Sequence, residues 1–258
     1  ESNYFTRTES WTLYTSVYLP SISYSLSITP LSKTQCATLD ARFLRSLLPR
    51  CGYNRNMPAA VRYAPFNAGG AGFKQLYVEQ GSLLLQQVTK FLNSPETQIG
   101  KLLVMALSWT QAFLGTSTLF LTDVQQPLPP VGPSFLLDVR SFLQDINGSI
   151  HLQTSPVSPP LRQNDRHIMD IVLRQKRWKP QHVQQINACR RFLQAQTLAD
   201  ITTIQGTRII PDAITGLDHP EDTFRVSTFN QKRPGQTAWN TWRRFLRTIC
   251  TNSAILYQ

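Results

Sequence analysis

The residues closest to a catalytic set are two carboxylates and an imidazole in one short stretch, Asp165, His167 and Asp170. Residues three apart share a helix face, so His167 and Asp170 would point the same way on a helix. Two-metal nucleases use carboxylates that converge on ions about 4 Å apart, and this stretch could supply part of such a site. The alternative is structural: Asp165 caps a helix, and Asp170 pairs with Arg174 or Arg166.

No other stretch of the sequence offers a complete catalytic motif. The glycine-rich run 69–72 lacks the Lys-Ser/Thr ending of a phosphate-binding loop and has no expected strand before it. No G-x-S-x-G nucleophile elbow and no adjacent pair of aspartates occurs. The cysteines, Cys36, Cys51, Cys189 and Cys250, form no C-x-x-C pair, so no zinc ribbon is expected. We therefore expect the chain to have no enzyme activity by itself and no cofactor or metal.

Charge is the most informative bulk property of the chain. Its 258 residues include 26 Lys and Arg against 15 Asp and Glu, which gives a formal net charge of +11. The isoelectric point is about 9.9. Such a basic chain is typical of proteins that bind a polyanion, and the phosphates of nucleic acids fit this charge best. An anionic membrane surface is less suitable because no long basic amphipathic helix is evident.

The first predicted binding cluster surrounds the irregular segment 52–72. Arginine side chains and glycine backbone amides together can hold a phosphate, because the amides add fixed partial positive charges. The alternative is that Tyr53, Met57 and Pro58 in this segment simply fill a gap in the core. The predicted phosphate-binding residues are Arg50, Arg55, Arg62, Gly69, Gly70 and Lys74.

The other two predicted clusters combine cations with tryptophan. In the run 174–179, the indole could stack on a base while its neighbours neutralise phosphates. The alternative is a solvated helix end, where cations suit the helix dipole. In the last expected helix, Trp239 and Trp242 should be buried, so its arginines face outward or pair with the acidic loop 218–222. The predicted binding residues are Arg174, Lys176, Arg177, Trp178 and Lys179 in the run, and Arg243, Arg244 and Arg247 in the helix.

Apolar periodicity predicts a mainly α chain with small β elements, an α+β fold in which a helical bundle precedes a smaller helix/β-hairpin module. A first helix should end at Pro20. A hairpin is expected from 197–204 and 207–210, and short strands at 119–122 and 150–152. The Pro/Ser-rich stretch 154–160 is the expected domain boundary. The clearest expected helices are 33–48, 73–92, 96–114, 134–147, 180–193 and 237–249. A further helix, capped by Asn164 or Asp165, is expected to carry 168–172.

Several ordered motifs extend from about residue 10 to about residue 248. The stretch LPRCGYNRNMPAAV at 48–61 is followed by GGAGF at 69–73. Shorter matches come later, namely RQNDRHIMD at 162–170, INACR at 186–190, LADI at 198–201 and WNTWR at 239–243. This order resembles the region that follows the polymerase palm in reverse transcriptases of non-LTR-type retrotransposons from algae and other microbial eukaryotes.

The resemblance implies a thumb and post-thumb role, in which thumb helices grip the template–primer duplex. The segment 33–48 matches the thumb by position, so 1–153 is the expected thumb-like helical domain and 154–258 the expected basic helical/hairpin module. The palm, with its Tyr-x-Asp-Asp motif, and the fingers are not in this sequence. The expected partners are RNA and DNA, as hybrid or duplex, and the missing fingers and palm of the same polypeptide. Mg²⁺ is expected in that missing palm, within a parent RNA-directed DNA polymerase.

The ends and the apolar runs also carry expectations about context. The chain opens at Glu1 with a polar run, and we expect it to be an excerpt from a longer protein. No signal peptide and no apolar run of about 18 residues is evident, so we expect an intracellular protein, in the nucleus or cytoplasm, without a membrane partner. Three hypotheses stay open: a nucleic-acid-binding module, a metal-dependent nuclease using Asp165, His167 and Asp170, and a non-functional structural remnant of a degenerate element.

Overall fold

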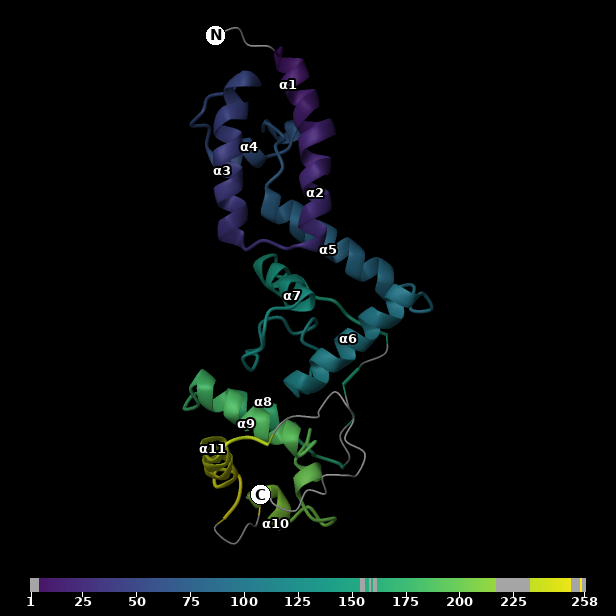
Figure 1. Cartoon of the computed structure of the whole chain (residues 1–258), viewed down its shortest axis with the longest axis vertical. Helices are drawn as coiled ribbons and strands as arrows, with labels where there is room; N and C mark the ends of the chain where they lie inside the picture. The colour runs from purple at the N-terminus through teal and green to yellow at the C-terminus, as the bar shows by residue number, and fades with distance from the viewer. Residues whose placement is uncertain are drawn as a thin grey trace. The chain divides into compact units, whose positions relative to one another are not determined.

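The computed structural model describes residues 5–153, 156–157, 159, 162–216, 233–251 and 256. The described chain is mainly helical, as the sequence predicts (Figure 1). It forms two compact units, Glu1–Gly100 and Lys101–Gln258. The boundary expected after residue 153 lies within the second of these units. No described helix is both long enough and apolar enough to cross a membrane.

The first unit opens with one continuous helical segment. Its three parts are α1 (Arg7–Leu13), a π-helix (Tyr14–Tyr18) and α2 (Leu19–Ile28). The prediction that this helix ends at Pro20 is wrong. Leu19 donates its amide to the carbonyl of Tyr14, five residues back, and this wider turn allows the helix to continue past a residue that lacks an N–H group.

The rest of the first unit packs around an aromatic core. A capping box of Ser32 and Gln35 starts α3, since each side chain bonds the other's backbone amide. The rings of Tyr18 and Phe43 stack with centroids 3.6 Å apart, and Phe73 packs against Tyr14 at 5.2 Å. The remaining elements are α3 (Lys33–Arg50), α4 (Ala59–Tyr63), a 3₁₀ turn (Phe66–Ala68) and α5 (Leu76–Leu92).

In the second unit, α11 packs against α9 (Figure 1). Trp239 and Trp242 are buried in the core, as predicted from their spacing. Pro180 opens α9 at its first position, where a proline is well tolerated. The elements are α6, which begins before the boundary (Gln98–Leu114), α7 (Phe135–Asp145), α8 (Ile168–Arg174), α9 (Pro180–Phe192), a 3₁₀ turn (Ala199–Ile201), α10 (Pro211–Thr215) and α11 (Gln236–Leu246).

The β elements are smaller than the sequence suggested. The expected hairpin is reduced to one antiparallel bridge between Thr202 and Ile209, and the described chain holds only two other isolated bridges. The expected strand at 119–122 is a turn, although Ile150 donates its amide to the carbonyl of Leu121 at 2.9 Å. The acidic loop 218–222 lies outside the described residues.

Two buried arginines hold the second unit together. Arg190 of α9 is fully buried and donates to the carbonyls of Ala112 and Phe113, at 3.0 and 2.9 Å, which closes the end of α6. Gly115 follows that end with φ +67°, and a Cβ there would lie 2.6 Å from the Arg190 Cζ. Burial lowers the pKa of Arg190 to about 9. These contacts explain why a glycine terminates α6 and why this cation is internal.

Arg140 of α7 plays a similar part for the loop that follows α6. It is buried and donates to four backbone carbonyls in that loop. Burial also lowers the pKa of Arg140. The loop lacks regular secondary structure, so a side chain satisfies carbonyls that a helix or sheet would otherwise pair. Part of the positive charge is therefore structural and is not available to a ligand. The four acceptors belong to Phe120, Asp123, Val124 and Gln126.

Candidate nucleic-acid interface

The predicted glycine cradle in the first unit has no free amides at its predicted positions. Gly69 and Gly70 donate their amides to the carbonyls of Phe66 and Pro65, at 3.0 and 3.1 Å. A Cβ on Gly70 would lie 2.0 Å from the carbonyl oxygen of Ala64. Glycine is therefore required here because two stretches of backbone approach closely. The structure favours the packing alternative for these two positions.

Arg62, predicted to bind phosphate, belongs to an internal polar network. Its guanidinium donates to the carbonyl of Met57 at 2.7 Å. Nearby, the buried carboxylate of Asp40 accepts the amide of Leu76, the first residue of α5, at 3.1 Å. Burial raises the pKa of Asp40, while the Leu76 amide, the Tyr63 hydroxyl and the charge of Arg62 oppose that rise. Arg62 thus bonds within its own segment, and its charge favours the ionised form of Asp40.

The other three cations of this cluster are exposed at separate places. Arg50 lines a largely apolar pocket of about 370 Å³ beside Tyr18 and Phe43. Arg55 lies in the loop after α3. Lys74 donates its backbone amide to the Tyr14 hydroxyl at 2.8 Å, and its side chain remains exposed. These side chains can reach an anion, but without the glycine amides that the sequence pattern suggested.

In the second unit, the run 174–179 forms the turn between α8 and α9, and Gln175 organises it. The Gln175 Oε1 atom accepts from the Arg177 Nε and Nη2 atoms, at 3.1 and 2.9 Å, and from the Trp178 Nε1 atom at 2.8 Å. Its Nε2 atom donates to the Thr248 hydroxyl, just beyond α11, at 3.3 Å. Sequence reasoning missed Gln175, because no spacing signal connects it to Thr248.

Trp178 does not offer its ring to a base as predicted. The side chain is only 8% exposed and packs against Phe245 and His182. Instead, two guanidinium groups, those of Arg177 and Arg244, each lie 5.0 Å from the centroid of its ring. The indole is thus buried by α11, and its aromatic face supports two exposed cations.

These contacts merge two predicted clusters into one surface. Arg244 comes from α11 and Arg177 from the turn before α9, and both are exposed. Arg247 follows one helical turn after Arg244, and Lys176 and Lys179 flank the indole in sequence. Arg243 is half-buried and donates to the Asn240 side chain at 3.4 Å, so it stands apart. We call the exposed group the Trp178 surface: Lys176, Arg177, Lys179, Arg244 and Arg247.

The helix-dipole alternative explains only part of this charge. Arg174 lies in the last turn of α8, where the dipole favours a cation. Lys179 is the N-cap of α9, where the dipole disfavours one. Within the described parts of the chain, no Asp or Glu forms an ion pair with the Trp178 surface. The helix dipole therefore does not account for the charge of Lys179.

The possible nuclease residues do come together, but in structural roles. Asp165, His167 and Asp170 all line one pocket of about 340 Å³. The carboxylate of Asp170 accepts the backbone amide of Ser117 at 3.2 Å, rather than pairing with an arginine as suggested. That of Asp165 accepts the amide of Ala199 at 3.1 Å. These bonds connect neighbouring segments of the second unit.

The helix that these residues were expected to begin also starts differently. The N-cap of α8 is His167, not Asp165, and its side chain makes no capping bond. The buried His167 instead forms an antiparallel bridge with Thr197. Among the described residues, no three His, Cys, Asp or Glu side chains are grouped so that they could hold a metal ion.

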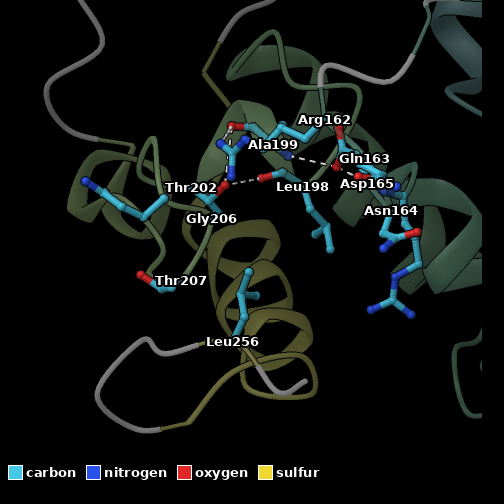
Figure 2. Close-up of a pocket in the computed structure, with 12 residues that line it drawn as sticks. Arg162, Gln163, Asn164, Asp165, Leu198, Ala199, Thr202, Gly206, Thr207 and Leu256 are labelled. Carbon is cyan, nitrogen blue, oxygen red and sulfur yellow. Dashed lines mark hydrogen bonds between the residues drawn. The ribbon is translucent and has the colours of Figure 1, made fainter.

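A further basic pocket, of about 380 Å³, lies beside this one and was not predicted (Figure 2). Arg162 crosses it and donates to the carbonyl of Ala199 at 3.1 Å. Gly206 has φ +71°, and a Cβ there would lie 2.4 Å from the Arg162 Nη1 atom. Arg166 also lines the pocket and is exposed. Isolated arginines in loops carry no sequence signal, so only the fold could assign them to a pocket.

Comparison with known proteins adds no relative. No family model matches this chain, and neither a curated protein nor a solved structure matches it.

Proposed function

We propose that the chain is a nucleic-acid-binding module that holds phosphates on the Trp178 surface. The observation that carries this proposal is the position of Arg177 and Arg244, which come from distant parts of the sequence and lie over one buried indole. A cluster of exposed cations on one face is the usual electrostatic feature of a surface that binds a polyanion.

The contacts beneath the two arginines favour tight phosphate binding. Arg177 is held by the Oε1 atom of the Gln175 side chain and by the ring of Trp178. It therefore loses little conformational freedom when it binds a phosphate. A guanidinium can meet two phosphate oxygens at once, which a lysine cannot do. The exposed lysines on either side would add charge without fixed geometry.

The resemblance to non-LTR reverse transcriptases supports a more specific proposal. In it, the chain is the thumb and post-thumb part of an RNA-directed DNA polymerase, working in the nucleus or cytoplasm with a palm that carries Mg²⁺ elsewhere in the polypeptide. An RNA–DNA hybrid and a duplex are then the first ligands to test. The fold and the charge support binding, and the ordered motifs alone support this parent enzyme.

The test is a fluorescence-anisotropy titration of the full chain on labelled duplex DNA and RNA–DNA hybrid over a range of salt concentrations. With Arg177→Gln and Arg244→Gln combined, the slope of log affinity against log salt on duplex DNA should shrink by about 1.8, or about 0.9 for each lost phosphate contact. The matched control combines Lys90→Gln with Lys101→Gln, two exposed cations outside the surface. Salt-independent binding, or equal slopes for the two double variants, would refute the proposal.

A further inference from the structure

We infer that the Trp178 surface is one end of a track for a single, unpaired nucleic-acid strand, which continues past Arg174 and Arg166 to Arg162. The inference rests on the proposed function and adds the class of ligand and three further binding residues. The observation behind it is that three pockets of the second unit are connected. Two of them share lining residues, and the third is linked to them by contacts between side chains.

The first link joins the two pockets at the start of α8. The Arg162 pocket, of about 380 Å³, and the Asp170 pocket, of about 340 Å³, are both lined by Asp165 and Arg166. Figure 2 shows Asp165 in the first of these pockets. The Asp170 pocket then extends to Arg174 and Gln175. An anionic chain leaving one pocket therefore enters the next past the exposed side chain of Arg166.

The second link passes through the Trp178 surface. Gln175, at the edge of the Asp170 pocket, bonds Arg177 and Trp178. The ring of Trp178 in turn supports Arg244. Arg244 lines the third pocket, the Asn240 pocket of about 370 Å³ between α9 and α11. The five arginines, Arg162, Arg166, Arg174, Arg177 and Arg244, thus follow one connected path.

The linings indicate unpaired bases rather than a closed duplex. The Asn240 pocket is lined by side-chain amides, hydroxyls and an imidazole, including Gln181, Gln185, Asn240 and His182. Asparagine, glutamine and arginine are the side chains that bond base edges. Bases of a single strand can turn into such hollows, whereas a duplex must first unstack and unpair, which costs a few kcal/mol per base.

The carboxylates along the track do not cancel its charge. Asp165 and Asp170 are the acidic residues that line the three pockets. Each already accepts a backbone amide, from Ala199 and Ser117 respectively. Five arginines against two carboxylates leave a net positive path, and neither Asp165 nor Asp170 lines the Asn240 pocket.

The test compares a fluorescein-labelled oligouridylate of about 15 nucleotides with an RNA–DNA hybrid of the same length, both bound by the full chain. Arg166→Gln should reduce the salt slope on the single strand by about 0.7, the value for one phosphate contact on unpaired nucleic acid. Arg174→Gln should do the same. Arg208→Gln removes an equally exposed arginine of the same unit that lines none of the three pockets, so it should leave the slope unchanged.

A neutral variant tests the base-reading part of the inference. Asn240→Ala should weaken binding of the single strand severalfold with an unchanged salt slope, and should leave the hybrid unaffected. Equal affinity for the hybrid and the single strand, or unchanged slopes in the Arg166 and Arg174 variants, would overturn the track. If the Arg177 and Arg244 variants still reduce the slope in that case, the proposed function stands and only the track fails. If none of the arginine variants reduces it, both fail.

Discussion

The two units differ in how many of their predicted phosphate-binding residues have internal roles. In the first unit, Gly69 and Gly70 use their amides internally, and the half-buried Arg62 bonds the Met57 carbonyl. In the second unit, two clusters far apart in sequence meet on one indole and remain exposed. Both regions look alike as basic sequence, so local composition does not separate a structural cation from a ligand-binding one.

The difference depends on the carbonyl groups near each cation. A helix end or an irregular loop leaves backbone carbonyls without partners, and a buried arginine can donate to them. Arg190 and Arg140 have this role. Arg177 and Arg244 have an aromatic ring beneath them instead, so their charged groups stay at the surface. Substitutions of buried and of exposed arginines therefore test whether the two groups have different roles.

The largest expected effect is on a buried arginine. Arg190→Ala should lower the free energy of unfolding of the second unit by about 3 to 5 kcal/mol, because several buried carbonyls lose their donor. The exposed counterpart, Arg244→Ala, should cost about 1 kcal/mol or less, the value of a cation–π contact. Urea denaturation followed by tryptophan fluorescence measures both. Similar losses for the two variants would contradict the division into structural and surface arginines.

A smaller loss of stability is expected for Gly70, and the neighbouring Gly69 serves as its control. Gly70→Ala should destabilise the unit by about 3 kcal/mol, since its Cβ would collide with the Ala64 carbonyl. Gly69→Ala meets no atom within 4 Å and should cost only about 1 kcal/mol, for its φ of +76°. Circular dichroism during urea denaturation measures this. Neither variant should alter the salt slope of nucleic-acid binding. A reduced slope would indicate that the amides of Gly69 and Gly70 do bind phosphate.

The smallest expected effect is a pH dependence from Asp40. Burial raises the pKa of this carboxyl, so the folded first unit holds its proton more tightly than the unfolded chain does. Its contribution to stability is full below the unfolded pKa of about 3.9 and is lost as pH rises through the higher folded pKa. Asp40→Asn removes this dependence, so wild type should lose stability relative to the variant as pH rises. A constant stability difference across pH would show that Asp40 does not titrate differently on folding.

Much of the helical framework followed from the sequence. The apolar periodicity predicted the helices that became α3, α5, α6, α7, α9 and α11, because amphipathic spacing acts locally. The helix expected to end at Pro20 failed because a π-turn widened the backbone before it. The expected hairpin formed only a single bridge.

The sequence by itself determined the helical class, the excess of positive charge and the burial of Trp239 and Trp242, since each depends on composition or on spacing within one element. Only the tertiary structure decided which arginines are internal and which face solvent. It placed Arg244 on the ring of Trp178 through the packing of α11 on α9, and it joined Gln175 to Thr248. Such contacts depend on the packing of distant elements, which no local pattern of residues records.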